Sequence, residues 1–222
     1  MVGGKVINVL YEDNSVIVVV KPAGILSQKS KDTDNSMLDM VKEYVKKKYN
    51  KPGNVYIGLV HRLDRNVSGV MVFARNSKSA SRLSEEVRSH KLKKKYYAVV
   101  SGIIKNDEGT FKDYLVKDKG FNTRVTSKEN GKESTLDYKV LKRDYKDNMT
   151  LVDIDLKTGR HHQIRVQFAS RGYPLCGDTR YGSVKGNLAL CAYSLTFIHP
   201  ITKKEMTFKI DMPSNKFFDN FK

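Results

Sequence analysis

The stretch Val60-His61-Arg62-Leu63-Asp64-Arg65-Asn66-Val67-Ser68-Gly69-Val70-Met71-Val72-Phe73-Ala74 decides how the rest of the chain is interpreted. Apolar runs at Tyr56 to Val60 and Val70 to Ala74 predict two strands, and the polar residues between them predict a turn. In that turn a single carboxylate, Asp64, stands between two arginines. Neighbouring positive charge favours the ionised form of a carboxyl group. An ionised carboxylate can act as a nucleophile or stabilise positive charge, and it is less suited to act as a general acid. The plain alternative is a loop aspartate that only ties down two arginines.

The balance of charge is the most informative feature of the composition. The 222 residues include 41 Lys and Arg against 24 Asp and Glu, a formal net charge of +17. Such a surplus favours an anionic polymer as partner, most often a nucleic acid, although a generally lysine-rich proteome would also raise the count. A membrane surface is less favoured, because neither basic run has the apolar face of an interfacial helix.

The remaining composition indicates an ordinary soluble protein. No apolar run approaches the ~20 residues of a membrane span, and no signal peptide is evident. Cys176 and Cys191 form neither a disulfide framework nor a metal-ligand pattern. We therefore expect a chain of the reducing cytoplasm that forms a single domain over residues 1–222, with two lobes around one cleft.

Local patterns predict the elements around the Asp64 turn. Two β-branched runs within residues 5–21 predict a hairpin, which ends at Lys21-Pro22-Ala23-Gly24. Ser36 and Asp39 form a capping-box pattern before one amphipathic helix, and Asn76 or Ser77 would cap a second. Residues 103–150 read as antiparallel strands joined by exposed turns. Together these patterns predict an α+β fold with a large, mainly antiparallel sheet.

A basic run leads into an aromatic strand at Lys93 to Gly102. Lysines followed by tyrosines can bring phosphate-binding charge and a stacking ring to one place. A strand start with a half-buried tyrosine is the plainer interpretation, and this segment alone would favour it.

A second group of polar side chains follows the strand that ends at Leu156. Thr158-Gly159 predicts a turn and a cap, and Ile164 and Phe168 share one face of a short helix that Gly172 closes. The start of this helix carries several donors and no acid to neutralise them, which favours an anion there: Arg160, His161, His162, Gln163 and Arg165. Adjacent histidines without nearby Cys or carboxylate ligands are weak grounds for zinc, and we expect no metal site.

Four motifs in one order resemble the RluA-type pseudouridine synthases. They are Tyr-Glu-Asp-x-x-x-x-Val-Val-x-Lys-Pro-Ala-Gly, the stretch around Asp64, Lys-x-Tyr-x-Ala-x-Val-x-Gly from Lys94, and Thr-Gly-Arg-x-His-Gln-Ile-Arg-Val from Thr158. Gly177-Asp178-x-x-Tyr181-Gly182 continues the resemblance as a loop crossing the site. The chain departs from many members by having Ser27-Gln28-Lys29 where a His often follows the first motif, His161 in place of Thr, and Gln167 and Cys191 in place of His.

The resemblance implies a fold and a set of site residues. The fold is a bisected sheet flanked by helices with a central basic cleft, in the form that lacks an N-terminal RNA-binding domain. Asp64 would be the nucleophile, Tyr96 rather than Tyr97 the ring on the target base, and Arg165 the partner that holds Asp64 ionised. The remaining expected substrate-binding residues are Lys21, His61, Arg62, Arg65, Lys94, Arg160, His162 and Gln163.

By the same resemblance the chain would isomerise uridine to pseudouridine in ribosomal or transfer RNA. The reaction moves neither electrons nor phosphoryl groups, so we expect no cofactor and no metal. RNA is the expected partner of a monomer that needs no membrane and no obligate protein partner. Two rivals remain: a catalytically silent RNA-binding module, and a metal-dependent phosphoesterase or nuclease, which would lack a second acidic cluster.

Overall fold

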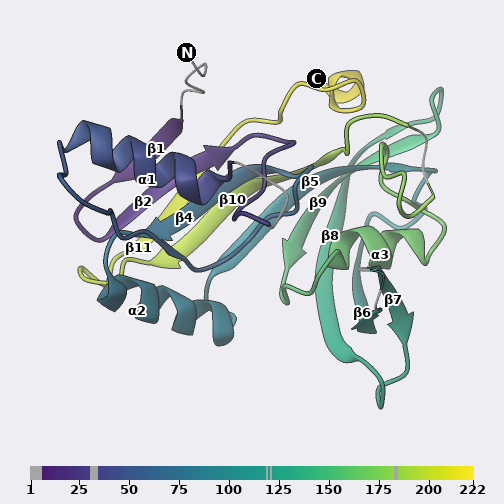
Figure 1. The fold of residues 1–222 in the computed structure, drawn as a ribbon. Helices are drawn as coiled ribbons and strands as arrows, with labels where there is room; N and C mark the ends of the chain where they lie inside the picture. The colour runs from purple at the N-terminus through teal and green to yellow at the C-terminus, as the bar shows by residue number, and fades with distance from the viewer. Residues whose placement is uncertain (1–6, 31–34, 119, 121, 183–184) are drawn as a thin grey trace. The chain divides into compact units, whose positions relative to one another are not determined.

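The fold was determined as a computed structural model, which describes residues 7–30, 35–118, 120, 122–182 and 185–222. The chain divides into two compact units (Figure 1). Unit 1 comprises Met1–Leu92 and Ser194–Ile210, and unit 2 comprises Lys93–Tyr193 and Asp211–Lys222. No helix in the described part of the chain is long and apolar enough to span a membrane.

Unit 1 is built on the antiparallel strands β1, β2 and β4, in that order. The second half of β10 follows β4, and β11 pairs with it in antiparallel fashion. Its strands are β1 (Asn8–Glu12), β2 (Val16–Lys21), β3 (Gly58–Leu59), β4 (Ser68–Ala74), β10 (Leu190–Ile198) and β11 (Glu205–Lys209). The expected hairpin within residues 5–21 is therefore present, although Lys5 and Val6 lie outside the described residues.

Helices α1 (Met37–Lys48) and α2 (Ser77–Arg88) lie on either side of these strands in Figure 1. The α2 residue Leu83 packs with Val16, Val18 and the same face of β4. Because β2 and β4 are covered on both faces, their sequences are nearly continuous apolar runs instead of alternating ones. Both expected N-caps are confirmed: Ser36 forms a capping box with Asp39, and Asn76 caps α2.

Unit 2 is an antiparallel sheet in the order β5-β9-β8-β6-β7, with the first half of β10 beside β5. Its strands are β5 (Lys93–Ser101), β6 (Glu108–Lys117), β7 (Thr123–Thr126), β8 (Lys132–Asp144) and β9 (Met149–Leu156). Helix α3 (Gln163–Ala169) and a 3₁₀ turn, η1 (Phe218–Phe221), complete the unit. The α+β class and the mainly antiparallel pairing are thus confirmed.

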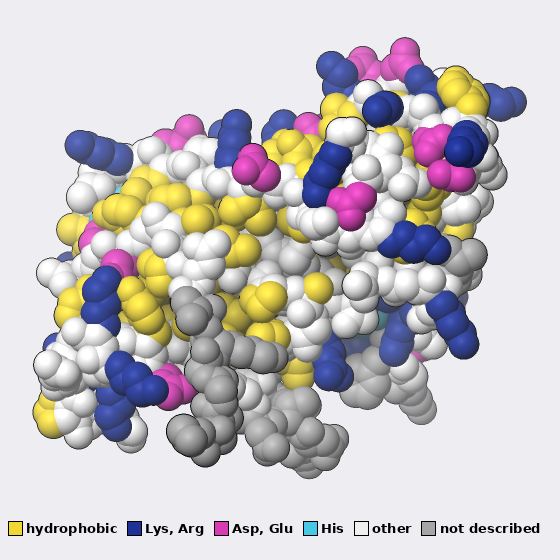
Figure 2. Space-filling model, turned by 90° about the horizontal axis from the view of Figure 1, so that it is seen from above, with side chains coloured by type: hydrophobic (Ala, Val, Ile, Leu, Met, Phe, Trp, Pro, Cys, Tyr) yellow, Lys and Arg dark blue, Asp and Glu magenta, His cyan; other side chains and the backbone are white. Residues whose placement is uncertain are grey.

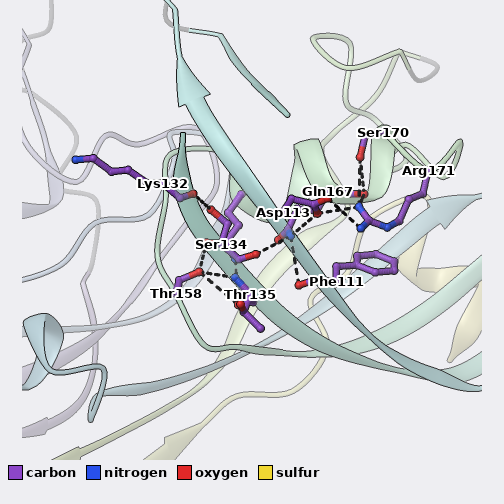
Figure 3. A network of polar contacts seen from close by, with 10 residues as sticks. Phe111, Asp113, Lys132, Ser134, Thr135, Thr158, Gln167, Ser170 and Arg171 are labelled. Atoms are coloured by element: carbon purple, nitrogen blue, oxygen red, sulfur yellow. Dashed lines mark hydrogen bonds and ion pairs between the residues drawn. The ribbon is translucent and has the colours of Figure 1, made fainter. Parts of the chain in front are cut away.

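Helix α3 is fixed to this sheet by an aromatic contact and a polar one. Phe168 meets the rings of Phe111 and Tyr138 with centroids 4.9 and 5.9 Å apart. The preceding residue, Gln167, is also buried, and its amide donates to Asp113 Oδ2 (2.7 Å), which also pairs with Arg171 (2.9 Å) (Figure 3). These contacts fix α3 against β6 and β8, and the predicted donors begin in the turn between β9 and α3.

Two local predictions are wrong. The strand before the Asp64 turn is only Gly58–Leu59, not Tyr56 to Val60, because pairing with β4 extends over those two residues and Tyr56 is exposed. Thr158 and Gly159 do not cap α3, which starts after His162 in the left-handed conformation (φ 52°) without a side-chain cap. The Thr158 hydroxyl bonds to Thr135 and Gln163 instead.

Candidate active site

In unit 1, the residues from His61 to Val67 form the connection between β3 and β4, here called the Asp64 loop. The Ser27 hydroxyl donates to the Leu63 carbonyl (2.8 Å) and accepts from the Leu63 N–H (3.0 Å). The Arg65 carbonyl accepts from the Gly24 N–H (2.8 Å), and Arg65 Nε donates back to the Gly24 carbonyl (3.1 Å). The segment after β2 therefore holds the backbone on both sides of Asp64.

Lys21 is the most unusual of the predicted site residues in unit 1, because its side chain is fully buried. Its ammonium group donates to the carbonyls of Pro22 (2.9 Å), Ile25 (2.7 Å) and Arg65 (3.0 Å). Burial lowers the pKa of Lys21 to about 8, and the negative charge of Asp64 opposes that shift. Lys21 thus supplies positive charge to the Asp64 loop from within unit 1, but its three bonds are to the protein's own backbone.

The side chains of the Asp64 loop divide by exposure. Arg62 and Arg65 are exposed and Asp64 is half-buried, so solvent reaches all three side chains. His61 is buried, and its Nε2 accepts a hydrogen bond from the Val72 N–H of β4 (3.1 Å). This bond requires the neutral ring with its proton on Nδ1. His61 therefore anchors the loop to β4, and its expected contact with substrate stays a prediction.

In unit 2, the turn from Lys157 to His162 is closed by the side chain of Gln163. Gln163 Oε1 accepts from the Arg160 N–H (3.0 Å) and from the Thr158 hydroxyl (2.8 Å), while Nε2 donates to the Thr135 carbonyl (3.1 Å). Gln163 is buried, so these bonds define the shape of the turn. The oxygen and the nitrogen of its side-chain amide both form hydrogen bonds within the protein. Its expected contact with substrate stays a prediction.

Lys94 of β5 reaches the same turn. Its ammonium nitrogen would lie 3.1 Å from a Cβ atom at Gly159, so any side chain at Gly159 would press on this group. Burial lowers the pKa of Lys94. Two of the predicted motifs, from β5 and from the β9–α3 turn, are thereby shown to meet.

The two histidines of the turn stack on each other, with ring centroids 3.7 Å apart. His161 Nδ1 lies 2.9 Å from the Thr123 hydroxyl, and His162 Nδ1 lies 2.8 Å from the Tyr181 hydroxyl. Each ring is thus held by a hydroxyl group. Among the described residues, no group of three or more His, Cys, Asp or Glu side chains could hold a metal ion.

The surroundings of Arg165 differ from those expected from the sequence. We expected no acid near the donors at the start of α3, but Asp178 pairs with Arg165 through two hydrogen bonds, Nε to Oδ2 (2.7 Å) and Nη2 to Oδ1 (2.8 Å). The Arg165 guanidinium also lies 5.1 Å from the centre of the Tyr181 ring. Asp178 is the only acid between Asp155 and Glu205 in the sequence, and this isolated position is the signal that could have identified it as a partner of the donors.

Tyr96 and Tyr97 occupy opposite faces of β5, since successive strand residues alternate. Tyr97 stacks on Tyr193 with centroids 3.8 Å apart and planes 8° from parallel, and Tyr193 donates to Asp153 (3.1 Å). Tyr96 shares its face with Lys94 and is 5% exposed. Tyr96, not Tyr97, is therefore on the strand face of the Lys94 turn.

The predicted site residues divide between the units. Unit 1 carries Lys21, His61, Arg62, Asp64 and Arg65, and unit 2 carries Lys94, Tyr96, Arg160, His162, Gln163 and Arg165. The surplus of positive charge is not gathered in one block on the face shown in Figure 2, where Lys and Arg lie among Asp and Glu. Exposed ion pairs, such as Lys112 with Glu133 (3.3 Å), likewise place opposite charges side by side.

Comparison with known proteins decides what kind of protein carries these residues. The family model described as RNA pseudouridylate synthase matches residues 15–170. The chain belongs to this family. That span includes the Asp64 loop, Tyr96 and Arg165, and the RluA-type resemblance is confirmed by relatives named ribosomal large subunit pseudouridine synthase C and D.

Related pseudouridine synthases match along nearly the whole chain. An uncharacterized RNA pseudouridine synthase of Aquifex aeolicus is 36% identical over 220 residues, which cover 93% of this chain and 70% of the relative. Ribosomal large subunit pseudouridine synthase C of Buchnera aphidicola (subsp. Schizaphis graminum) is 34% identical, with 96% and 69% covered. This pseudouridine synthase also shares its fold with human RNA pseudouridylate synthase domain containing 4 (TM-score 0.78, 21% identity, 96% and 90% covered).

Proposed function

We propose that this pseudouridine synthase isomerises uridine in ribosomal or transfer RNA, with Asp64 as the nucleophile. The observation that carries the proposal is the Asp64 loop itself: a half-buried carboxylate whose backbone is fixed on both sides by Ser27 and Lys21. Binding alone requires no carboxylate inside a set of cationic side chains. Large-subunit ribosomal RNA is the first substrate to test, because the names of several relatives refer to the ribosomal large subunit.

The proposed reaction needs the target uridine outside its base stack. Lys and Arg side chains attract the RNA backbone, with Arg62, Arg65 and Arg160 as the exposed candidates. Asp64 then attacks the nucleotide, at the ribose or at the base, and the bond between N1 and the ribose breaks. A carboxylate stabilises the positive charge that develops on the sugar, as it does in glycosidases.

The freed uracil turns and bonds to the ribose through its carbon 5, and the bond between Asp64 and the nucleotide breaks. Carbon 5 then loses its proton and N1 gains one, so that Asp64 is regenerated. Tyr96 would stack on the base and assist in removing that proton. Arg165 would serve the Asp64 carboxylate by keeping it ionised. Atoms and electrons balance within the nucleotide itself, so the reaction as proposed calls on no cofactor.

The test uses RNA that carries tritium on carbon 5 of its uridines. Wild type and Asp64→Asn are incubated with unmodified ribosomal or transfer RNA, with and without a chelator, and released tritium is counted. We expect release by wild type and none by Asp64→Asn, while Asp211→Asn, an exposed control, behaves as wild type. The active RNA then shows which uridine to map.

Three other outcomes would change the proposal. Tight RNA binding without release from either RNA would favour the silent RNA-binding module. Tritium release that continues in Asp64→Asn would show that Asp64 is not the nucleophile. Tritium release that the chelator abolishes would favour a metal-dependent reaction.

A further inference from the structure

We infer that Asp178 is a positioning residue for the isomerisation, acting through Arg165; this inference rests on the proposed function of Arg165. The carboxylate of Asp178 binds one edge of the guanidinium group, formed by Nε and Nη2, at 2.7 and 2.8 Å. A guanidinium group is planar, so two bonds along one edge fix both its plane and its direction. The donors on its other edge are then aimed by Asp178.

Both partners are withdrawn from water, which strengthens the constraint. The Asp178 side chain has no exposed surface and that of Arg165 is 11% exposed. A buried charge that loses its partner is costly, so neither group has a favourable alternative position. Tyr181 borders the guanidinium group, and its own hydroxyl is fixed by the Thr123 N–H (3.0 Å).

The loop that carries Asp178 is itself held rigidly against β5. The N–H of Cys176 donates to the Val99 carbonyl (2.9 Å), and the Cys176 carbonyl accepts from Ala189 (2.9 Å). Gly177 has a positive φ of 79°, and a Cβ atom there would lie 2.7 Å from the carbonyl carbon of Asn187. Asp178 therefore links the direction of Arg165 to the strand that carries Tyr96.

The chain offers a matched control in the same unit. Asp113 binds Arg171 in the same two-point manner, Nη1 to Oδ2 (2.9 Å) and Nη2 to Oδ1 (3.1 Å) (Figure 3), but Arg171 lies two residues beyond the C-terminal end of α3. Asp113→Asn breaks a comparable ion pair and should lower stability. Because it leaves Arg165 untouched, it should not change the rate of the chemical step.

The decisive experiment is a double-mutant cycle in single-turnover tritium release. We expect Asp178→Asn to slow the chemical step ~10- to 100-fold, the usual effect of a misplaced catalytic group. RNA affinity should change less than ~3-fold, because the lost interaction is used in the reaction and not in binding. In the Arg165→Lys background, where the planar fork is already gone, Asp178→Asn should cost less than ~3-fold more.

Full additivity in this cycle, or an equal loss of rate in Asp113→Asn, would overturn the inference in favour of a purely structural role. A second measurement needs no RNA and no folded Asp178 variant. In wild type, the Nε–H resonance of Arg165, assigned by its disappearance in Arg165→Lys, should exchange slowly with solvent. Exchange as fast as that of exposed arginines would also overturn the inference, whereas slow exchange in a protein that releases no tritium would refute only the proposed function.

Discussion

The ammonium nitrogen of Lys21 lies 3.0 Å from the backbone carbonyl oxygen of Arg65, 44 residues further along the chain. This bond ties the end of β2 to the loop that carries Asp64. The burial of Lys21 makes the bond dependent on pH, because burial lowers its pKa from 10.5 to about 8. The consequence for stability can be measured.

Lys21 should make the protein more stable as the pH rises from 8 to 10. The unfolded chain binds a proton at Lys21 up to pH 10.5 and the folded chain only up to about pH 8, so the unfolded state holds more protons between these values. Raising the pH through this window therefore relieves the burial of a charge, by about 2 kcal/mol at pH 10.

Urea unfolding at pH 8 and pH 10 checks this prediction. The free energy of unfolding of wild type should rise relative to that of Lys21→Met, in which this titration is absent and all other groups titrate as before. An identical dependence on pH in the two proteins would show that Lys21 keeps an ordinary pKa when folded.

Ser27→Ala should destabilise the Asp64 loop. Ser27 is buried, and its hydroxyl both donates to and accepts from the backbone of Leu63. Its loss leaves a buried N–H and a buried carbonyl without this partner, which costs about 1–3 kcal/mol. Chemical denaturation measures that loss, and tritium release should fall as well because Asp64 follows Leu63. Ser81→Ala, on the exposed side of α2, is the control and should leave both quantities unchanged.

Gly177 and Gly172 provide a matched pair for the loop that carries Asp178. Their φ angles are alike, 79° and 81°, but a Cβ atom at Gly172 meets nothing within 4 Å while one at Gly177 collides with the backbone of Asn187. Gly172→Ala should cost only the backbone strain of about 1–2 kcal/mol. Gly177→Ala should cost at least about 2 kcal/mol more, since the backbone must shift. Equal losses in urea unfolding would mean that the loop yields to the new methyl group.

Tyr96 and Tyr97 are neighbours on β5 that should differ in function. Tyr96→Phe keeps the ring but removes the hydroxyl, so single-turnover release should slow by ~10²-fold or more if that hydroxyl assists proton removal. Tyr97→Phe preserves the stack on Tyr193 and should leave the rate near that of wild type. The reverse ranking in the tritium assay would transfer the proposed role to Tyr97.

Much of the fold could be predicted because its signals are local. The capping box of Ser36 and Asp39, the cap at Asn76 and the closure of α3 by Gly172 each depend on residues a few positions apart. Where a local signal was weak the prediction failed, as in the cap of α3. There the Thr158 hydroxyl bonds to Thr135, a contact across the sheet that neighbouring sequence does not encode.

The sequence by itself determined the family, the order of the elements and the chemistry available at Asp64, because these follow from residue types at fixed spacings. Only the tertiary structure decided which groups restrain that chemistry. The burial of Lys21, the internal bonds of His61 and Gln163, and the pairing of Arg165 with Asp178 all join residues brought together by packing. Electrostatic and hydrogen-bond energies depend on distance and on exclusion of water, and neither is a property of position along the chain.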